Sequence, residues 1–261
     1  MRFGFGKNWS DFVDQKFSPQ RVETARQHIL NFIGRADLNG IDFLDIGCGS
    51  GLHSFAAFKS GARTIRGFDF DADSVAATRR LQAIAGSPDN WTVGQGDILD
   101  DEFVKSLGTA NLVYSWGVLH HTGNVWKAVD NAKRTVEPGG LFYIALYSAD
   151  VQPQRDYWLR IKQEYNAADE AKKGRMVWQY IWEHAMGRNP LRGLAVLYRI
   201  ATYRLNRGMD YFADIRDWLG GWPMEFVFDK DVIERVEGKS EFKLVNIATG
   251  HANTEFLFKR L

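Results

Sequence analysis

The feature that most constrains the fold is an apolar segment that runs directly into three closely spaced glycines, Phe43-Leu-Asp-Ile-Gly-Cys-Gly-Ser-Gly51. A buried strand that continues through a sharp turn into a helix needs glycine there, because glycine tolerates positive φ values and lets another group approach the backbone closely. The spacing G-x-G-x-G differs from the G-x-G-x-x-G of dinucleotide-binding dehydrogenases. The segment therefore predicts an α/β sheet with a ligand site after its first strand, and disfavours a nicotinamide dehydrogenase.

Strand-like and helix-like segments alternate from residue 41 to about residue 148, which predicts a mainly parallel sheet covered by helices. The expected strands are Phe43–Ile46, Thr64–Phe68, Trp91–Val93, Asn111–Trp116 and Leu141–Tyr147. The expected helices between them are Leu52–Lys59, Asp73–Ala85, Asp101–Leu107 and Val125–Val136. An earlier helix is expected to begin after Ser18, with Pro19 in its first turn, and to end at Gly34.

The alternation of strands and helices stops after residue 150, where a stretch rich in Trp, Tyr and Arg lacks the apolar spacing of a strand. A helix near Asp229–Val236 and two strands near Phe242–Ala248 and Thr254–Lys259 follow it, and the short loop between these strands predicts antiparallel pairing. The expected segments are a lid at 1–34, a cofactor-binding core at 35–150, a helical insertion at 151–223 and the completion of the sheet at 224–261. The insertion is expected to cap the carboxyl ends of the strands.

Composition narrows the class of protein. The chain has 261 residues, 45% of them hydrophobic and 25% charged, and a formal net charge of +1, so a nucleic-acid partner is not expected. Cys48 is the only cysteine, which excludes an internal disulfide and a multi-cysteine metal site. The N-terminus lacks a signal-peptide pattern and no run of about 18 apolar residues occurs, so a cytoplasmic location away from membranes is expected. The oligomeric state stays open.

Acidic residues stand at the ends of the first two strands. Asp45, before the glycines, would repel a pyrophosphate but suits a ligand with an ammonium or sulfonium group. Asp69 lies 18 residues after Gly51 and is placed to accept hydrogen bonds from both hydroxyls of a ribose. The alternative role for Asp69 is the N-cap of the next helix, which Asp71 or Asp73 fills better.

Further ligand contacts are expected after the second and third strands. Phe70 could stack on an adenine ring, Asp97 could accept a hydrogen bond from the adenine amino group, and Ile98 could wall the ring. A Gly-Asp pair after a strand is by itself usually only a turn. Its position as the third acidic site in the series favours a functional role.

Asp45–Gly51, Asp69 and Asp97 together resemble the first three motifs of class I S-adenosylmethionine-dependent methyltransferases. The resemblance implies a Rossmann-like, doubly wound, seven-stranded, mostly parallel sheet with an antiparallel last strand. It implies S-adenosyl-L-methionine as cofactor and S-adenosyl-L-homocysteine as product. The residues expected to contact the cofactor are Asp45, Gly47, Cys48, Gly49, Gly51, Asp69, Phe70, Asp97, Ile98 and Ser115.

The segment Tyr114-Ser-Trp-Gly-Val-Leu-His-His-Thr-Gly123 resembles bacterial methyltransferases that carry V-L-H-H after the fourth strand and are similar to quinone-pathway methylases. His120 and His121 are candidate general bases, because histidine titrates near neutrality, and the rate should then fall below about pH 6.5. Alternatively, one of the pair only hydrogen-bonds the scaffold. The segment lacks the carboxylates with which some quinone O-methyltransferases bind a divalent metal, so no metal is expected.

Two segments dense in aromatic residues and glycine are expected to enclose the methyl acceptor. The expected aromatic walls of the acceptor site are Trp9, Trp116, Trp218 and Trp222, and the expected polar contact to the acceptor is Glu225 or Asn8. Packing between insertion and core is the alternative role. Arginines of the insertion could bind a carboxylate or phosphate on the acceptor, or simply form a solvated helix face: Arg155, Arg160, Arg199, Arg204 and Arg207.

The sequence thus indicates a methyltransferase (EC 2.1.1.-) acting on a small molecule, with O-methylation favoured. Two alternatives stay open. A tRNA methyltransferase would need a stronger basic patch than the net charge supplies, although the insertion has a modest basic surplus. A cofactor-binding regulator without catalysis is the other, and the intact segment after the fourth strand argues against it.

Overall fold

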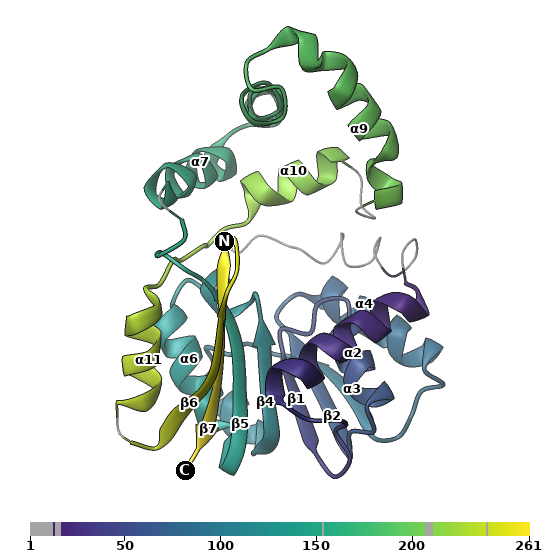
Figure 1. Cartoon of the computed structure of the whole chain (residues 1–261), viewed down its shortest axis with the longest axis vertical. Coiled ribbons are helices and arrows are strands. Elements are labelled where there is room, and N and C mark those ends of the chain that lie inside the picture. Colours follow the sequence, from purple (N-terminus) through teal and green to yellow (C-terminus); the bar gives the residue numbers. More distant parts are fainter. Residues whose placement is uncertain (1–12, 14–16, 153, 207–210, 239) are drawn as a thin grey trace.

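The computed structural model describes residue 13 and residues 17–152, 154–206, 211–238 and 240–261. Seven strands in this part of the chain form one sheet with the order β3-β2-β1-β4-β5-β7-β6 (Figure 1). The strands are β1 Asp42–Ile46, β2 Thr64–Asp69, β3 Trp91–Gln95, β4 Ala110–Trp116, β5 Val136–Tyr147, β6 Phe242–Thr249 and β7 Asn253–Arg260. The pairs from β3 to β5 are parallel, and β7 is antiparallel to both β5 and β6. The predicted Rossmann-like sheet with an antiparallel last strand is confirmed.

Helices cover both faces of the sheet and leave the carboxyl ends of the parallel strands for the loops. They are α2 Pro19–Ile33, α3 Leu52–Lys59, α4 Ala72–Ile84, α5 Asp101–Leu107, α6 Val125–Arg134 and α11 Asp229–Glu237. Successive strand residues point to opposite faces. Phe43 packs with residues of α2, α3 and α4, whereas Leu44 packs with residues of α5, α6 and α11. The two apolar clusters are thus separated by the sheet.

Local sequence signals set several helix ends as predicted. Ser18 accepts a hydrogen bond from the Arg21 N–H at the start of α2, and Gly34 ends that helix in the left-handed conformation. Asp71, and not Asp69, is the N-cap of α4.

The predicted boundary between α6 and β5 is wrong. The helix ends at Arg134, and β5 begins at Val136, which pairs with Ala110 at the start of β4. A bulge after this pair carries the strand past Gly140, where a Cβ would lie 2.9 Å from the Glu137 carbonyl oxygen. Glycine removes this clash, so β5 extends back to Val136, which had been assigned to the end of the predicted helix.

Residues between β5 and α11 form a helical insertion that lies above the carboxyl ends of the strands (Figure 1). Its helices are α7 Arg155–Ala167, α8 Glu170–Tyr180, η2 Ile181–Ala185, η3 Pro190–Arg192, α9 Gly193–Asn206 and α10 Tyr211–Gly220. The insertion has an apolar cluster of its own, which includes Tyr165, Val177 and Ile215. No helix in the described ranges combines the length and apolar character needed to cross a membrane.

Candidate active site

The glycine-rich turn after β1 is tied to the end of β2 through Asp69. The Gly49 N–H donates to Oδ2 of Asp69 (2.9 Å), and the Asp71 N–H donates to its Oδ1 (2.9 Å). Each carboxylate oxygen therefore accepts at least one backbone hydrogen bond, and an oxygen can accept more than one. This arrangement fixes the carboxylate and is compatible with the predicted contact to ribose hydroxyls.

The glycines of this turn have φ values of 75° at Gly47, 54° at Gly49 and 83° at Gly51. A Cβ on Gly47 would lie 2.3 Å from Cγ1 of Val118, and one on Gly51 would lie 2.8 Å from Cγ2 of Thr78. The sequence suggested that glycine leaves room for a ligand. At these two positions it leaves room for side chains of the protein itself. The approach of Gly47 and Val118 also sets the loop after β4 beside the turn after β1.

Cys48 and Ser115, both predicted to contact the cofactor, have side chains that form hydrogen bonds within the protein. The Thr78 hydroxyl donates to Sγ of Cys48 (3.3 Å), and burial raises the pKa of this thiol well above its usual value. The Ser115 hydroxyl donates to the Ile46 carbonyl oxygen (3.0 Å) and so joins the ends of β4 and β1. Both side chains brace the site, and their direct contact with a cofactor stays a prediction.

Asp45 is a buried carboxyl group with only 2% of its surface exposed. The Ser54 hydroxyl donates to its Oδ2 (2.6 Å). The pKa of Asp45 is raised to about 7, mainly by burial and also by the nearby negative charge of Asp69. The hydrogen bond from Ser54 lowers this pKa but does not offset the burial. No cation of the described residues forms an ion pair with either carboxyl group. A ligand that brings an ammonium or sulfonium group fits this unbalanced pair.

The residues expected around an adenine ring lie at the ends of β2 and β3. Phe70 is 51% exposed. Asp97 accepts a hydrogen bond from the Leu99 N–H (2.9 Å) at its Oδ1. Ile98 is buried in the apolar cluster on the α5–α6 face, and its carbonyl oxygen accepts from Nδ2 of Asn131 (2.8 Å). Their contacts with adenine stay predictions.

The two histidines after β4 have different environments. His120 is fully buried, and its Nδ1 accepts a hydrogen bond from the Tyr147 N–H (3.3 Å). The neutral ring therefore carries its proton on Nε2, a buried atom without a partner in the described residues. Burial lowers the pKa of His120 well below its usual value, and the charges of His121 and Lys162 lower it further. His120 is accordingly an uncharged, buried group in the loop.

His121 makes a hydrogen bond between Nδ1 and the Pro223 carbonyl oxygen (2.8 Å). Because a carbonyl only accepts, Nδ1 carries the proton and the basic lone pair lies on Nε2. Burial lowers the pKa of His121 to about 4, although the bond to Pro223 acts in the opposite direction. If His121 is the base, the rate of methyl transfer is therefore expected to fall near pH 4 and not near pH 6.5.

The segment after the insertion holds the histidine loop in place. The Glu225 N–H donates to the His120 carbonyl oxygen (2.9 Å), and Oε2 of Glu225 accepts from the Val125 N–H (3.0 Å) at the start of α6. The carboxylate predicted to be a handle for the acceptor thus also binds the first turn of a helix. Its contact with an acceptor stays a prediction.

The predicted tryptophan walls that the structure describes belong to different elements, and their contact with an acceptor stays a prediction. Trp116, at the end of β4, lies with its ring centroid 6.3 Å from that of His53. Trp218 packs inside the insertion, edge-to-face with Trp158 at 5.3 Å. Trp222 is half-buried. Trp9 and Asn8 lie outside the described residues, as does Arg207.

Sequence reasoning missed Lys162, which lies on α7 with 2% of its surface exposed. Its Nζ donates to the Trp218 carbonyl oxygen and lies 4.4 Å from the centroid of the Trp218 ring. Burial lowers its pKa to about 7, opposed by the negative charge of Asp217. The only sequence signal is its helical spacing from the buried Tyr165, three residues later.

The chain is similar to known proteins over part of its length. Residues 44–142 match the protein family described as a methyltransferase domain. The chain is similar to the ubiquinone biosynthesis O-methyltransferase of Rhizobium rhizogenes, with 27% identity over 135 residues that cover 50% of this chain and 52% of the relative. It is also similar to the tRNA U34 carboxymethyltransferase of Methylococcus capsulatus, with 30% identity over 105 residues, 40% of this chain and 32% of the relative. The chain matches about half or less of the length of these relatives.

A similar fold occurs in the magnesium protoporphyrin IX methyltransferase of Synechocystis, whose crystal structure contains S-adenosylhomocysteine. The TM-score is 0.53 at 14% sequence identity, and the alignment covers 100% of this chain and 90% of the other. At this identity the likeness concerns the fold alone.

Proposed function

Since the chain belongs to the class I S-adenosylmethionine-dependent methyltransferases, we propose that it transfers a methyl group to a small-molecule acceptor, with a hydroxyl oxygen as the favoured target. The observation that carries the proposal is a pair of carboxyl groups without a described cation, the buried Asp45 on β1 and the half-buried Asp69 at the end of β2. Both lie next to the glycine-rich turn that contacts Val118 of the histidine loop. The helical insertion lies over this edge of the sheet (Figure 1).

The cofactor is S-adenosylmethionine, which supplies an electrophilic methyl group on a sulfonium when bound. Asp45 and Asp69 are the residues suited to its positive charges and ribose hydroxyls. Hydrogen bonds from Ser54 and from the Gly49 N–H hold these carboxyl groups in place before binding, so little reorganisation is needed.

His121 is suited to remove the proton of an acceptor hydroxyl. Its bond to Pro223 fixes the ring and the tautomer, and its low pKa keeps it unprotonated at neutral pH. The same low pKa makes it a weak base, so it would act only as the hydroxyl begins to form its bond to the methyl carbon. Positioning of the acceptor supplies the rest of the acceleration.

A small-molecule acceptor is supported by the insertion above the strand ends and by the relative that acts in ubiquinone biosynthesis. A tRNA acceptor is a second candidate, favoured by the similarity to the tRNA U34 carboxymethyltransferase.

Purified enzyme with tritiated cofactor should be incubated separately with a small-metabolite extract and with total tRNA. Label in a metabolite supports the proposal, and label in tRNA supports the second candidate. Tight cofactor binding without any transfer would indicate a regulator.

A further inference from the structure

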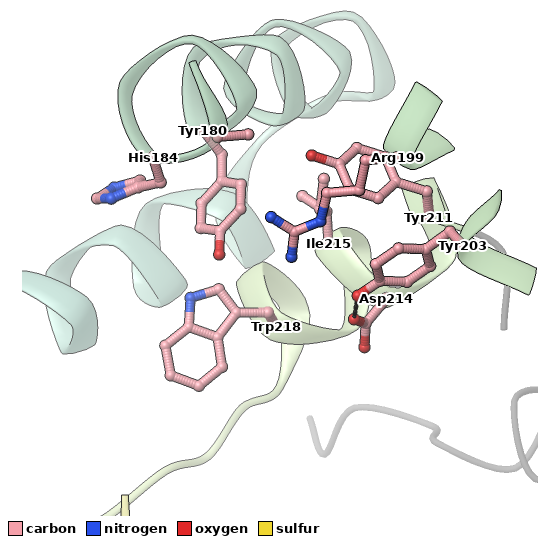
Figure 2. A pocket seen from close by; sticks show the side chains of 9 residues that line it. Tyr180, His184, Arg199, Tyr203, Tyr211, Asp214, Ile215 and Trp218 are labelled. Carbon is pink, nitrogen blue, oxygen red and sulfur yellow. Dashed lines mark hydrogen bonds between the residues drawn. The ribbon is translucent and has the colours of Figure 1, made fainter. Parts of the chain in front are cut away.

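The helical insertion contains a cavity of about 210 Å³ that is partly open to solvent and is lined by residues of η2, α8, α9 and α10 (Figure 2). Its described lining includes Tyr180, Arg199, Tyr203, Tyr211, Asp214 and Trp218. None of them comes from the loops after β1 to β4. The cavity is thus separate from the carboxyl pair and the histidine loop, and an inference about its ligand does not depend on the proposed function.

One charged hydrogen-bond donor extends into this cavity, and a second, buried donor belongs to a residue of its wall. The Arg199 guanidinium extends between the aromatic rings toward its centre (Figure 2). It lies 5.8 Å from the Tyr203 ring and 5.9 Å from the Tyr211 ring, and no described carboxylate forms an ion pair with it. The buried Nε1 of Trp218 has no acceptor among the described residues. A buried donor without an acceptor costs stability, and a ligand oxygen would remove that cost.

Asp214, the one carboxylate among the described lining residues, forms a hydrogen bond within the protein. The Tyr203 hydroxyl donates to Oδ2 of Asp214 (Figure 2). This bond moderates the repulsion between Asp214 and an incoming anion, whereas Arg199 attracts it. Arg199 is also solvent exposed, so a ligand can reach its guanidinium from outside the insertion.

The shape and the walls of the cavity limit the body of the ligand. A volume of about 210 Å³ corresponds to roughly seven water molecules, enough for one small ring with a substituent. Rings of Tyr180, Tyr211 and Trp218 line it, and flat faces of this kind favour an aromatic ligand. A guanidinium fork matches a carboxylate through two parallel hydrogen bonds.

We propose that this cavity is a binding site for a small aromatic carboxylate, with the carboxylate on the Arg199 guanidinium, the ring between the aromatic side chains, and the Trp218 indole N–H as a further donor. Neither S-adenosylmethionine nor transfer chemistry is needed for this binding.

The test is calorimetric titration of the full chain with benzoate as the probe and acetate as the comparison. Benzoate should bind saturably and at least about tenfold more tightly than acetate, because only benzoate uses the aromatic walls. Arg199→Gln should weaken benzoate binding by at least about tenfold, since two charge-assisted hydrogen bonds are lost. Trp218→Phe keeps a ring but removes the N–H, and it should weaken binding by about fivefold.

Arg192→Gln is the matched control, because Arg192 is an exposed arginine of the insertion outside the cavity lining. It should leave benzoate binding unchanged. Binding of S-adenosylhomocysteine should be equal in all variants, which separates damage to the fold or to the cofactor site from loss of this site. Absence of saturable benzoate binding, equal binding of acetate, or equal losses in Arg199→Gln and Arg192→Gln would each overturn the proposal.

Discussion

The strand-end site and the helical insertion hold their charges in opposite ways. At the strand ends, two carboxyl groups lie together without a cation and are fixed by backbone and hydroxyl donors. In the insertion, Lys162 and Arg199 lie against aromatic rings and form no ion pair with a described carboxylate. Buried charge without a counter-ion is costly, and the exposed Arg199 lacks a described carboxylate partner, so each region is best stabilised by a ligand of the opposite sign. The first region therefore suits a cation and the second an anion.

The sharpest test of this contrast removes the proposed base at the strand ends. His121→Ala should lower the rate of methyl transfer by about 10²–10⁴-fold, because proton removal from the acceptor is lost. The affinity for S-adenosylhomocysteine should hardly change. Because the pKa of His121 is about 4, the wild-type rate at saturating cofactor and acceptor should stay flat from pH 8 to about pH 5 and fall below that.

His120→Ala is the paired variant for this experiment. His120 is buried and accepts the Tyr147 N–H, so its removal should lower the melting temperature more than the rate. Equal rates in wild type and His121→Ala, measured at saturating acceptor, would show that orientation alone drives transfer and that the favoured O-methylation should be abandoned.

The next largest effect is expected from the carboxylate that joins the two turns. Asp69→Ala should weaken S-adenosylhomocysteine binding by at least tenfold, through loss of hydrogen bonds worth roughly 1.5–3 kcal/mol each. Calorimetry measures this directly. Asp73→Ala changes an exposed aspartate in the first turn of α4 and should leave affinity unaltered. Matching affinities for both variants would remove Asp69 from the cofactor site.

A smaller effect is expected on the affinity for S-adenosylhomocysteine when the pH changes. Asp45, with a pKa raised to about 7, is increasingly protonated below neutrality and then attracts a cationic ligand less. Binding of S-adenosylhomocysteine should weaken by about tenfold from pH 7.5 to 5.5, and Asp45→Asn should abolish this dependence. Without ligand, the folded chain binds more protons than the unfolded chain between about pH 4 and 7, so this group makes stability fall as pH rises through that range. A wild-type affinity independent of pH would contradict the assignment.

The last prediction concerns the insertion and is measured as stability rather than as rate or affinity. Lys162 has a pKa lowered to about 7, so above that pH the unfolded chain binds more protons than the folded chain and stability rises with pH. Between pH 7 and 9.5 the gain from this group should be about 3 kcal/mol, visible as a higher melting temperature. Lys162→Met should reduce the gain, whereas Lys105→Met, at an exposed lysine of α5, should preserve it. An equal gain in wild type and Lys162→Met would show that Lys162 is not desolvated.

The sequence by itself determined the elements whose signals are local. Alternation of apolar residues set the strands, Ser18 and Gly34 set the ends of α2, and positive φ values at Gly47 and Gly51 follow from the turn that ends β1. These features depend on stereochemistry and hydrogen bonding within a few residues, so they can be predicted without knowing what packs against them.

Only the tertiary structure decided how the side chains of the sites are used. The bond of His121 to Pro223 spans 102 residues, and that of Lys162 to Trp218 spans 56. No local pattern records such pairs. Burial by distant segments then sets the pKa values, which is why His121 titrates near 4 and why Lys162 went unnoticed. The chemistry of a side chain depends on its solvent exposure and neighbours, and those are properties of the folded chain.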